Sequence, residues 1–259
     1  MLQLQHVNKI YLGGSVNEHS LFRDFNLDID DGDFVSVIGS NGSGKTSLLN
    51  IICGSIGVDS GQILLDEIKL DGMPEHRRQR YIARVFQDPG KGTAPDMTIL
   101  ENLSIASNKH RHFNWMPGID QKSRHYFGEQ LERLGMGLEN RMDQICGSLS
   151  GGQRQALSLL MATLDTPKLL ILDEHTAALD PRISEHIMSL TNEIVSRLGV
   201  KTLMVTHNLR FALEYGNRLL MMHEGEVILD RNGDGKKNLQ LSDILDRFNQ
   251  ISIEYGNSI

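Results

Sequence analysis

The stretch FVSVIGSNGSGKTS, residues 34–47, joins a short apolar run to a glycine-rich loop. The run 34–38 is interrupted only by a serine, which is typical of a strand buried on both faces of a parallel sheet. The loop 39–46 satisfies the pattern G-x-x-x-x-G-K-S/T, and residues 47–52 can form the helix that should follow it. A strand, a glycine loop and a helix in this order predict an α/β fold built around a phosphate-binding loop.

The residues of this loop suit a chain of phosphates. Its glycines let successive backbone N–H groups turn toward one centre, and the N-terminus of the following helix adds partial positive charge. Lys45 would place a positive charge at the β- and γ-phosphates, and Thr46 would offer a hydroxyl to Mg²⁺. The predicted phosphate-contacting residues are Gly39, Ser40, Asn41, Gly42, Ser43, Gly44, Lys45 and Thr46.

Two carboxylates follow a second apolar run, residues 169–172. Mg²⁺ takes few carboxylates and completes its octahedron with phosphate oxygens and water, so one aspartate at a strand end is the expected ligand. Asp173 occupies that position. Glu174 should point the other way, because neighbouring strand residues face opposite sides, and it suits a base or orienter for an attacking water. The alternative is that both carboxylates merely face solvent at a strand end.

The segment LSGGQRQ, residues 149–155, begins an apolar helix. Ser150 and Gln153 have the S-x-x-Q spacing of a capping box, which explains both residues structurally. Gly151 and Gly152 are not explained in this way, since each glycine in a helix costs up to ~1 kcal/mol of propensity. Bare glycines at a helix N-terminus would let phosphate oxygens approach the backbone closely.

Composition limits the possible classes of protein. The chain has 259 residues, of which 39% are hydrophobic and 23% charged, as in an ordinary soluble α/β domain. Its apolar runs are far shorter than the ~18 residues that a membrane-spanning helix needs. A net charge of -7 argues against a nucleic-acid surface. Cys53 and Cys146 show no metal-ligand spacing, so we expect two buried thiols in the reducing cytosol.

The remaining segments predict a single domain over residues 1–259 with an inserted part. Strands are expected at 7–11, 25–29, 169–173 and 203–206, and a hairpin at 219–229. A helix should begin at Pro181, with Asp180 as its N-cap, and end at Gly199. Residues 88–147 are polar and poor in strand signals, which indicates a helical subdomain. The core would then comprise residues 1–87 and 148–230, with a helical tail over 231–259.

Taken together, the motifs resemble those of ATP-binding cassette (ABC) ATPases. LSGGQRQ is similar to the signature motif of that family. GSNGSGKT, Gln87 in VFQD, LLILDE, Ala178-Leu179-Asp180 and Val205-Thr206-His207 match further family motifs in the family's order and spacing. The resemblance covers nearly the whole chain. It implies a P-loop NTPase core with a mainly parallel sheet, an N-terminal antiparallel β subdomain and an inserted α-helical subdomain.

The resemblance also implies roles for individual residues. ATP would be bound by the phosphate loop with Ser47, by Tyr11 stacking on adenine, and by Ser150, Gly151, Gly152 and Gln153 of a second subunit. Mg²⁺ would be held by Thr46, Gln87 and Asp173, and Glu174, His207 and Gln87 would be catalytic. Asp180 would communicate between subunits. Tyr11 could instead be a packing residue, and Asp180 has a sufficient reason as a helix cap.

The family's assembly implies partners that the chain does not contain. Two copies, or this chain and a paired cassette, would close over ATP, and transmembrane permease subunits would hold the pair at the cytoplasmic face of the membrane. The chain most resembles bacterial importers of small solutes that work with a substrate-binding lipoprotein, often assigned to amino acids such as tryptophan or tyrosine. A soluble ABC ATPase of iron–sulfur cofactor assembly is the alternative.

Three further features of the sequence bear on its function. Residues 230–235 match the start of a calcium loop, but Leu241 stands where its bidentate glutamate is needed, so we expect a glycine turn. KHRHFNW, residues 109–115, mixes basic and aromatic residues, and we expect a solvated loop and no bound nucleic acid. His175 stands where most family members have proline. It could tune the neighbouring carboxylate or be a local substitution.

Overall fold

The predicted phosphate-loop strand lies inside a six-stranded sheet of order β10-β9-β3-β8-β7-β6 in the computed structural model, which describes residues 1–14, 19–108 and 120–254. Every residue of β3 (Phe34–Gly39) is buried, as its apolar composition predicts. β3, β6, β7, β8 and β9 run parallel, and β10 pairs antiparallel with β9. The other strands are β6 (Ile82–Val85), β7 (Leu169–Asp173), β8 (Lys201–Val205), β9 (Arg218–His223) and β10 (Glu226–Asn232).

A second, antiparallel sheet comes mainly from the N-terminal part of the chain. Its order is β2-β1-β4-β5, and its strands are β1 (Leu2–Tyr11), β2 (His19–Ile29), β4 (Ser60–Leu65) and β5 (Ile68–Lys69). β1 and β2 are longer than predicted. Leu2 and Leu4 alternate with glutamines and bury their side chains, so the strand begins well before residue 7. The predicted fold class is confirmed.

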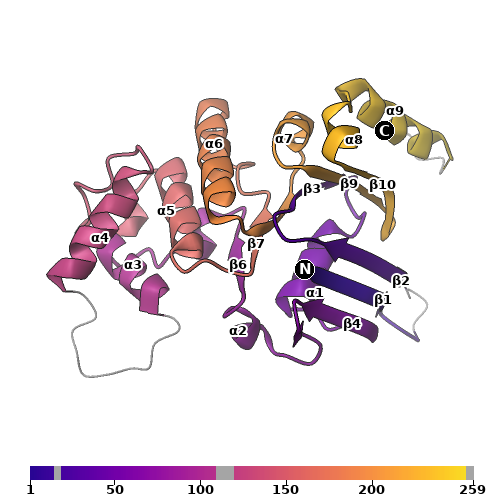
Figure 1. Cartoon of the computed structure of the whole chain (residues 1–259), viewed down its shortest axis with the longest axis horizontal. Coiled ribbons are helices and arrows are strands. Elements are labelled where there is room, and N and C mark those ends of the chain that lie inside the picture. Colours follow the sequence, from indigo (N-terminus) through magenta and orange to yellow (C-terminus); the bar gives the residue numbers. More distant parts are fainter. Residues whose placement is uncertain (15–18, 109–119, 255–259) are drawn as a thin grey trace.

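Helices cover both faces of the parallel sheet (Figure 1). α1 (Lys45–Cys53) shares one core with the antiparallel sheet and with Leu169 and Ile171 of β7. Leu170 and Leu172 belong to the core on the opposite face, with α5 (Gly151–Thr163) and α6 (Pro181–Leu198). The alternation along β7 therefore anchors the phosphate-loop helix on one side and the signature helix on the other.

The described part of segment 88–147 consists of helices joined by turns and loops, and its only strand-like pairing is an isolated bridge between Thr98 and Ile145. It forms one end of the molecule, opposite the antiparallel sheet (Figure 1). Its elements are η1 (Pro89–Gly92), α3 (Ile99–Asn108), α4 (Gln121–Glu132) and η2 (Cys146–Ser148), preceded by α2 (Glu75–Arg78). The basic and aromatic stretch 109–115 lies outside the described residues.

The C-terminal part adds α7 (Leu209–Glu214), α8 (Gly233–Lys237) and α9 (Leu241–Glu254). The prediction of a glycine turn at residues 230–235 is wrong. Asp230 belongs to β10, where its carboxylate accepts hydrogen bonds from Arg218, and α8 begins at Gly233. Among the described residues, no group of three or more His, Cys, Asp or Glu could hold a metal ion.

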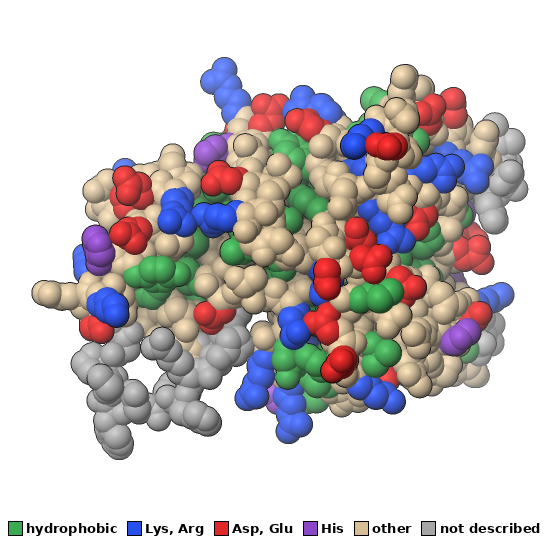
Figure 2. All heavy atoms as spheres, in the orientation of Figure 1, with side chains coloured by type: hydrophobic (Ala, Val, Ile, Leu, Met, Phe, Trp, Pro, Cys, Tyr) green, Lys and Arg blue, Asp and Glu red, His purple; other side chains and the backbone are tan. Residues whose placement is uncertain are grey.

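The surface carries mixed charge, with acidic and basic side chains interspersed over the face in Figure 2. None of the helices in the described ranges is long and apolar enough to cross a membrane. Both cysteines are buried, as predicted. Burial raises the thiol pKa of Cys53 to about 11 and that of Cys146 to about 11, so both stay protonated at neutral pH.

Candidate active site

The candidate site lies where three neighbouring parallel strands end. β8 lies between β3 and β7, with Val205 paired to Val37 on one side and to Asp173 on the other. Because parallel strands end at the same edge of a sheet, the phosphate loop, the acidic pair and the segment after β8 meet there. Crevices at this edge are the usual ligand sites of open α/β sheets.

The phosphate loop needs its glycines for two different reasons. Gly42 and Gly44 have left-handed φ angles of 80° and 101°, which side chains disfavour. At Gly39 an added Cβ would lie 2.3 Å from the carbonyl oxygen of Met222, so the backbone of β9 approaches too closely for any other residue. At Gly42, by contrast, a Cβ would meet nothing within 4 Å and would project into open space. The loop therefore leaves a bare cradle that fits phosphate oxygens.

Lys45 is held inside this loop. Its Nζ donates to the carbonyl oxygens of Gly39 and Ser40, both at 2.8 Å, and to Ser43 Oγ at 3.3 Å. Burial lowers the pKa of Lys45, and the Glu174 carboxylate opposes this shift. The ammonium group therefore already lies at the phosphate loop. Phosphate oxygens could replace the loop oxygens as its hydrogen-bond acceptors.

A hollow of about 330 Å³ opens over the loop. At one side of this hollow the Tyr11 hydroxyl donates to Ser47 Oγ at 3.2 Å. Tyr11, the residue predicted to stack on adenine, therefore lies beside the loop. Glu174 and His207 reach the hollow from the ends of β7 and β8. Ten predicted site residues line it: Tyr11, Asn41, Gly42, Ser43, Gly44, Lys45, Thr46, Ser47, Glu174 and His207. The structure brings these residues together.

Glu174 is held in an unusual conformation. Its φ of 48° is left-handed, and its N–H donates to the carbonyl oxygen of Val205 at 3.0 Å. The Glu174 carboxylate lies 2.8 Å from His207 Nε2. Left-handed conformations of residues other than glycine cost about 1–3 kcal/mol and concentrate at functional sites. The strain points to a position selected for geometry, not for stability alone.

The neighbouring Asp173 has a partner that the sequence analysis missed. Arg84 Nη2 donates to Asp173 Oδ2 at 2.6 Å, and both side chains are largely buried. The available signal was a charged residue within the otherwise apolar strand β6, beside β7. The oxygen donors at this edge, the Thr46 hydroxyl and one carboxylate, fit the preference of Mg²⁺ for few protein ligands. Gln87 is exposed and lies outside the hollow.

The capping box predicted at the start of α5 is confirmed. Ser150 Oγ accepts from the Gln153 N–H at 3.3 Å, and Gln153 Oε1 accepts from the Ser150 N–H at 3.2 Å. The interpretation of Gly152 as a phosphate contact needs a correction. A Cβ added there would lie 2.4 Å from Ile183 Cγ2 of α6, so helix packing explains why this residue is glycine. Gly151 is exposed, and a Cβ added there would make only an ordinary contact with Leu179 Cδ2 at 3.5 Å.

Residues 150–153 and Asp180 lie outside the hollow over the phosphate loop. Asp180 caps α6 as predicted, its Oδ1 accepting from the Ile183 N–H at 3.1 Å, and it remains exposed. Ser150, Gly151 and Asp180 are exposed, so they are available to another molecule, whereas Gly152 is buried.

Comparison with known proteins agrees with this geometry. The family profile described as "ABC transporter" matches residues 22–177. A tyrosine transport ATP-binding protein of Clostridioides difficile (strain R20291) is 46% identical over 248 residues, which cover 96% of this chain and 98% of that protein. The chain belongs to the ABC transporter family. Like other ATP-binding cassettes, it is an ATPase subunit that binds ATP.

Solved structures of other ABC cassettes share the fold. The cassette MJ0796, in a dimeric post-hydrolysis state bound to ADP and Pi, has a TM-score of 0.75 and 30% identity, covering 90% of this chain and 98% of that one. CbiO1 of Clostridium perfringens, part of the ABC transporter complex CbiONQ, has a TM-score of 0.77 and 27% identity, covering 98% and 96%. The iron–sulfur alternative gains no support from these relatives.

Proposed function

We propose that this ABC ATPase powers a bacterial importer of a small solute, and that the solute is an aromatic amino acid of the tyrosine type. The observation that carries the proposal is the 46% identity to the tyrosine transport protein, aligned over nearly the full length of both chains. An alignment of this extent covers the surfaces proposed to contact partner subunits as well as the proposed ATP site. A substrate-binding lipoprotein would deliver the amino acid outside the membrane.

The active unit is proposed to be a dimer of cassettes. The signature residues and the phosphate loop of one chain occupy separate surfaces, so a second copy is needed to complete each ATP site. A two-fold arrangement lets Ser150, Gly151 and Gln153 of one copy close over ATP held by the other. The dimeric MJ0796 cassette provides a precedent of the same fold.

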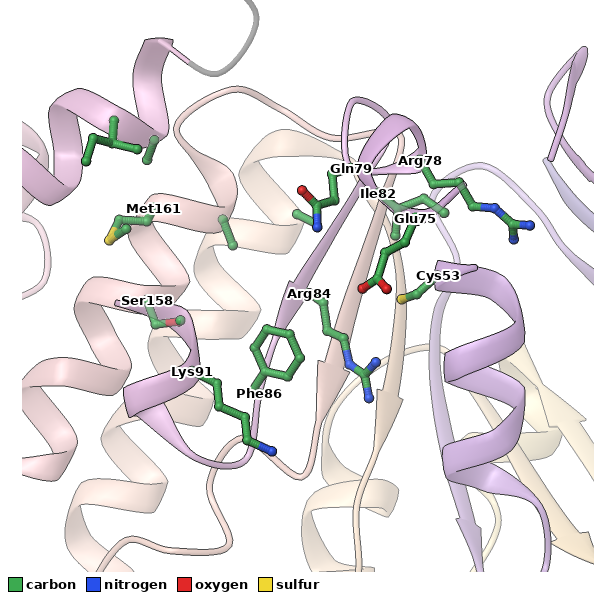
Figure 3. Close-up of a pocket in the computed structure, with 15 residues that line it drawn as sticks. Cys53, Glu75, Arg78, Gln79, Ile82, Arg84, Phe86, Lys91, Ser158 and Met161 are labelled. Atoms are coloured by element: carbon green, nitrogen blue, oxygen red, sulfur yellow. The ribbon is translucent and has the colours of Figure 1, made fainter. Parts of the chain in front are cut away.

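A groove between the sheet core and the helical segment is proposed to receive a permease segment at the cytoplasmic face. It holds about 350 Å³ and is lined by residues that include Cys53, Glu75, Arg78, Arg84, Phe86 and Lys91. Figure 3 shows Arg84 and Phe86 side by side within it. Gln87 directly follows Phe86, so a segment bound in the groove would lie beside the residue proposed to sense it.

Hydrolysis is proposed to rest on positioning and charge. Lys45 and the loop N–H groups bind the β- and γ-phosphates, and Glu174 orients or deprotonates the attacking water. His207, whose Nε2 lies 2.8 Å from the Glu174 carboxylate, is proposed to contact the γ-phosphate. Thr46, Asp173 and Gln87 would hold Mg²⁺, which when bound neutralises charge on the phosphoryl oxygens. ATP between two cassettes holds them together, and its hydrolysis releases them.

Glu174→Gln tests the catalytic and transport assignments together. The amide keeps the size of the side chain but cannot act as a base, so we expect ATP binding to persist and phosphate release to fall by about 10²–10⁴-fold. The ATP-bound variant should accumulate as a dimer on size-exclusion chromatography. Uptake of labelled tyrosine into proteoliposomes with the permease and lipoprotein should stop.

Glu193→Gln on the exposed face of α6 is the control and should behave like the parent. Parental turnover in Glu174→Gln would refute the role of Glu174. A parent complex that takes up another solute in preference to tyrosine and tryptophan would refute the cargo while leaving the ATPase assignment intact.

A further inference from the structure

Arg84 joins two elements of the ATP site. Its Nη2 donates to Asp173 Oδ2 at 2.6 Å, at the end of β7, and its Nη1 donates to Asn50 Oδ1 at 2.9 Å, in α1. Asn50 lies one helical turn after Thr46, on the same side of α1. One guanidinium group therefore spans the helix that carries Thr46 and the strand that carries Asp173.

The guanidinium is fixed in a third direction as well. Its Cζ lies 5.0 Å from the centroid of the Phe86 ring, and Figure 3 shows the two side chains together. Only 14% of the Arg84 side chain is exposed. Its Nε is buried without a hydrogen-bond partner among the described residues, so the guanidinium is held through its two Nη atoms and the Phe86 ring.

We propose that Arg84 is a positioning residue that braces Thr46 and Asp173 at the separation that Mg²⁺ with ATP requires. The inference rests on the proposed metal role of Asp173. By donating to Oδ2, the guanidinium restricts the orientation of the Asp173 carboxylate, which would hold the metal through its other oxygen. Outer partners of this kind orient metal ligands, and their loss weakens metal affinity or activity by about 10–100-fold.

Only arginine supplies a planar guanidinium whose N–H donors are held in fixed directions. Its N–H groups point in fixed directions and reach two acceptors at once, whereas the lysine ammonium is a point charge on a flexible stem. Arg84→Lys therefore keeps the positive charge near the site and removes the bridge. The substitution separates positioning from the electrostatic effect of the charge.

The test measures the metal's contribution to ATP binding without turnover. In the Glu174→Gln background, the Kd of ATP is measured in excess Mg²⁺ and in EDTA, and the ratio Kd(EDTA)/Kd(Mg²⁺) reports the metal's share. We expect Arg84→Lys to lower this ratio by about 10-fold or more. The Kd in EDTA should stay within about 2-fold, because the phosphate loop is untouched. An unchanged ratio would overturn the brace.

A double-mutant cycle tests the bridge itself. Asn50→Ala removes one arm, so Asn50→Ala combined with Arg84→Lys should lower the ratio no further than Arg84→Lys alone. Independent, additive effects would overturn the proposal. Arg80→Lys, at an exposed position of the same segment, is the control and should leave the ratio unchanged.

Asp173→Asn distinguishes failure of the Arg84 brace from failure of the proposed metal role of Asp173. If it lowers the ratio and the Arg84 variant does not, the brace is wrong and the metal role of Asp173 stands. If Asp173→Asn leaves the ratio unchanged, the proposed metal role itself fails, and the brace with it.

Discussion

His175 stands beside the two site carboxylates in the chain, yet its ring faces the opposite direction. The residue is 2% exposed, and its Nε2 lies 3.2 Å from Thr191 Oγ1 of α6. Burial lowers the pKa of His175 to about 4, so the ring is neutral near pH 7. The structure favours a local packing role over electrostatic tuning of Glu174.

The buried ring predicts a pH-dependent stability. Between its folded pKa of about 4 and the ordinary value of 6.5, the unfolded chain binds the proton and the folded chain does not. Stability contributed by the neutral ring is therefore lost as pH falls through this window, by about 2 kcal/mol at pH 5. His175→Gln keeps a polar group near Thr191 but cannot titrate.

Urea unfolding of both proteins at pH 7.5 and pH 5 measures the effect. Between pH 7.5 and pH 5, the loss in free energy of unfolding should be about 2 kcal/mol smaller for His175→Gln than for the wild-type protein. Equal losses in the two proteins would contradict a neutral, buried His175. Phosphate release at pH 7.5 should be similar in both proteins, since the ring contacts neither Glu174 nor the phosphate loop.

At the scale of elements, α5 and α6 pack closely because the residue at their contact, Gly152, has no side chain. Gly152 lets the first turn of α5 lie directly against Ile183 in the first turn of α6. The capped ends that carry Ser150 and Asp180 are therefore fastened to each other. Any movement of the signature helix should carry the start of α6 with it.

Gly152→Ala should destabilise the protein by about 1–3 kcal/mol, because the added methyl overpacks the contact with Ile183. Gly151→Ala is the matched control. Its Cβ would meet only an ordinary contact, so its free energy of unfolding should change by less than about 1 kcal/mol. Chemical denaturation measures both. Ile183→Ala combined with Gly152→Ala should cost less than the sum of the two, and strict additivity would argue against the clash.

At the scale of the whole molecule, the two proposed halves of an ATP site lie on different surfaces of one chain. The hollow over the phosphate loop contains Lys45 and Glu174, whereas Ser150 begins α5 outside it. Binding of ATP to a single chain and hydrolysis by a pair should consequently respond to different residues.

Ser150→Arg should leave the Kd of ATP for the monomer within about 3-fold, while abolishing ATP-dependent dimers and phosphate release. The bulky charge would block the surface proposed to close over the partner's ATP, and loss of the cap would cost only about 1 kcal/mol. Size-exclusion chromatography and phosphate release measure both effects. Ser150→Ala controls for the cap, and Ser189→Arg on the exposed face of α6 controls for the charge. Full hydrolysis by a dimer with Ser150→Arg in both copies would refute the signature role.

The sequence by itself determined the phosphate loop, the cap of α5 and the cap of α6. Each depends on residues within a few positions of one another, whose backbone chemistry is local. Buried strands such as β3 and β7 could also be predicted, since both faces of a parallel sheet are covered and the run is apolar throughout.

Tertiary structure alone decided which side chains meet across elements. The bridge from Arg84 to Asp173 and Asn50 joins residues up to 89 positions apart, and a charged residue within strand β6 does not by itself indicate which side chains it contacts. The direction of His175 and the clearance at Gly152 likewise depend on how α6 packs. Local chemistry identifies the residues that hold a ligand, but contacts between elements decide what holds those residues, because packing is set by the whole fold.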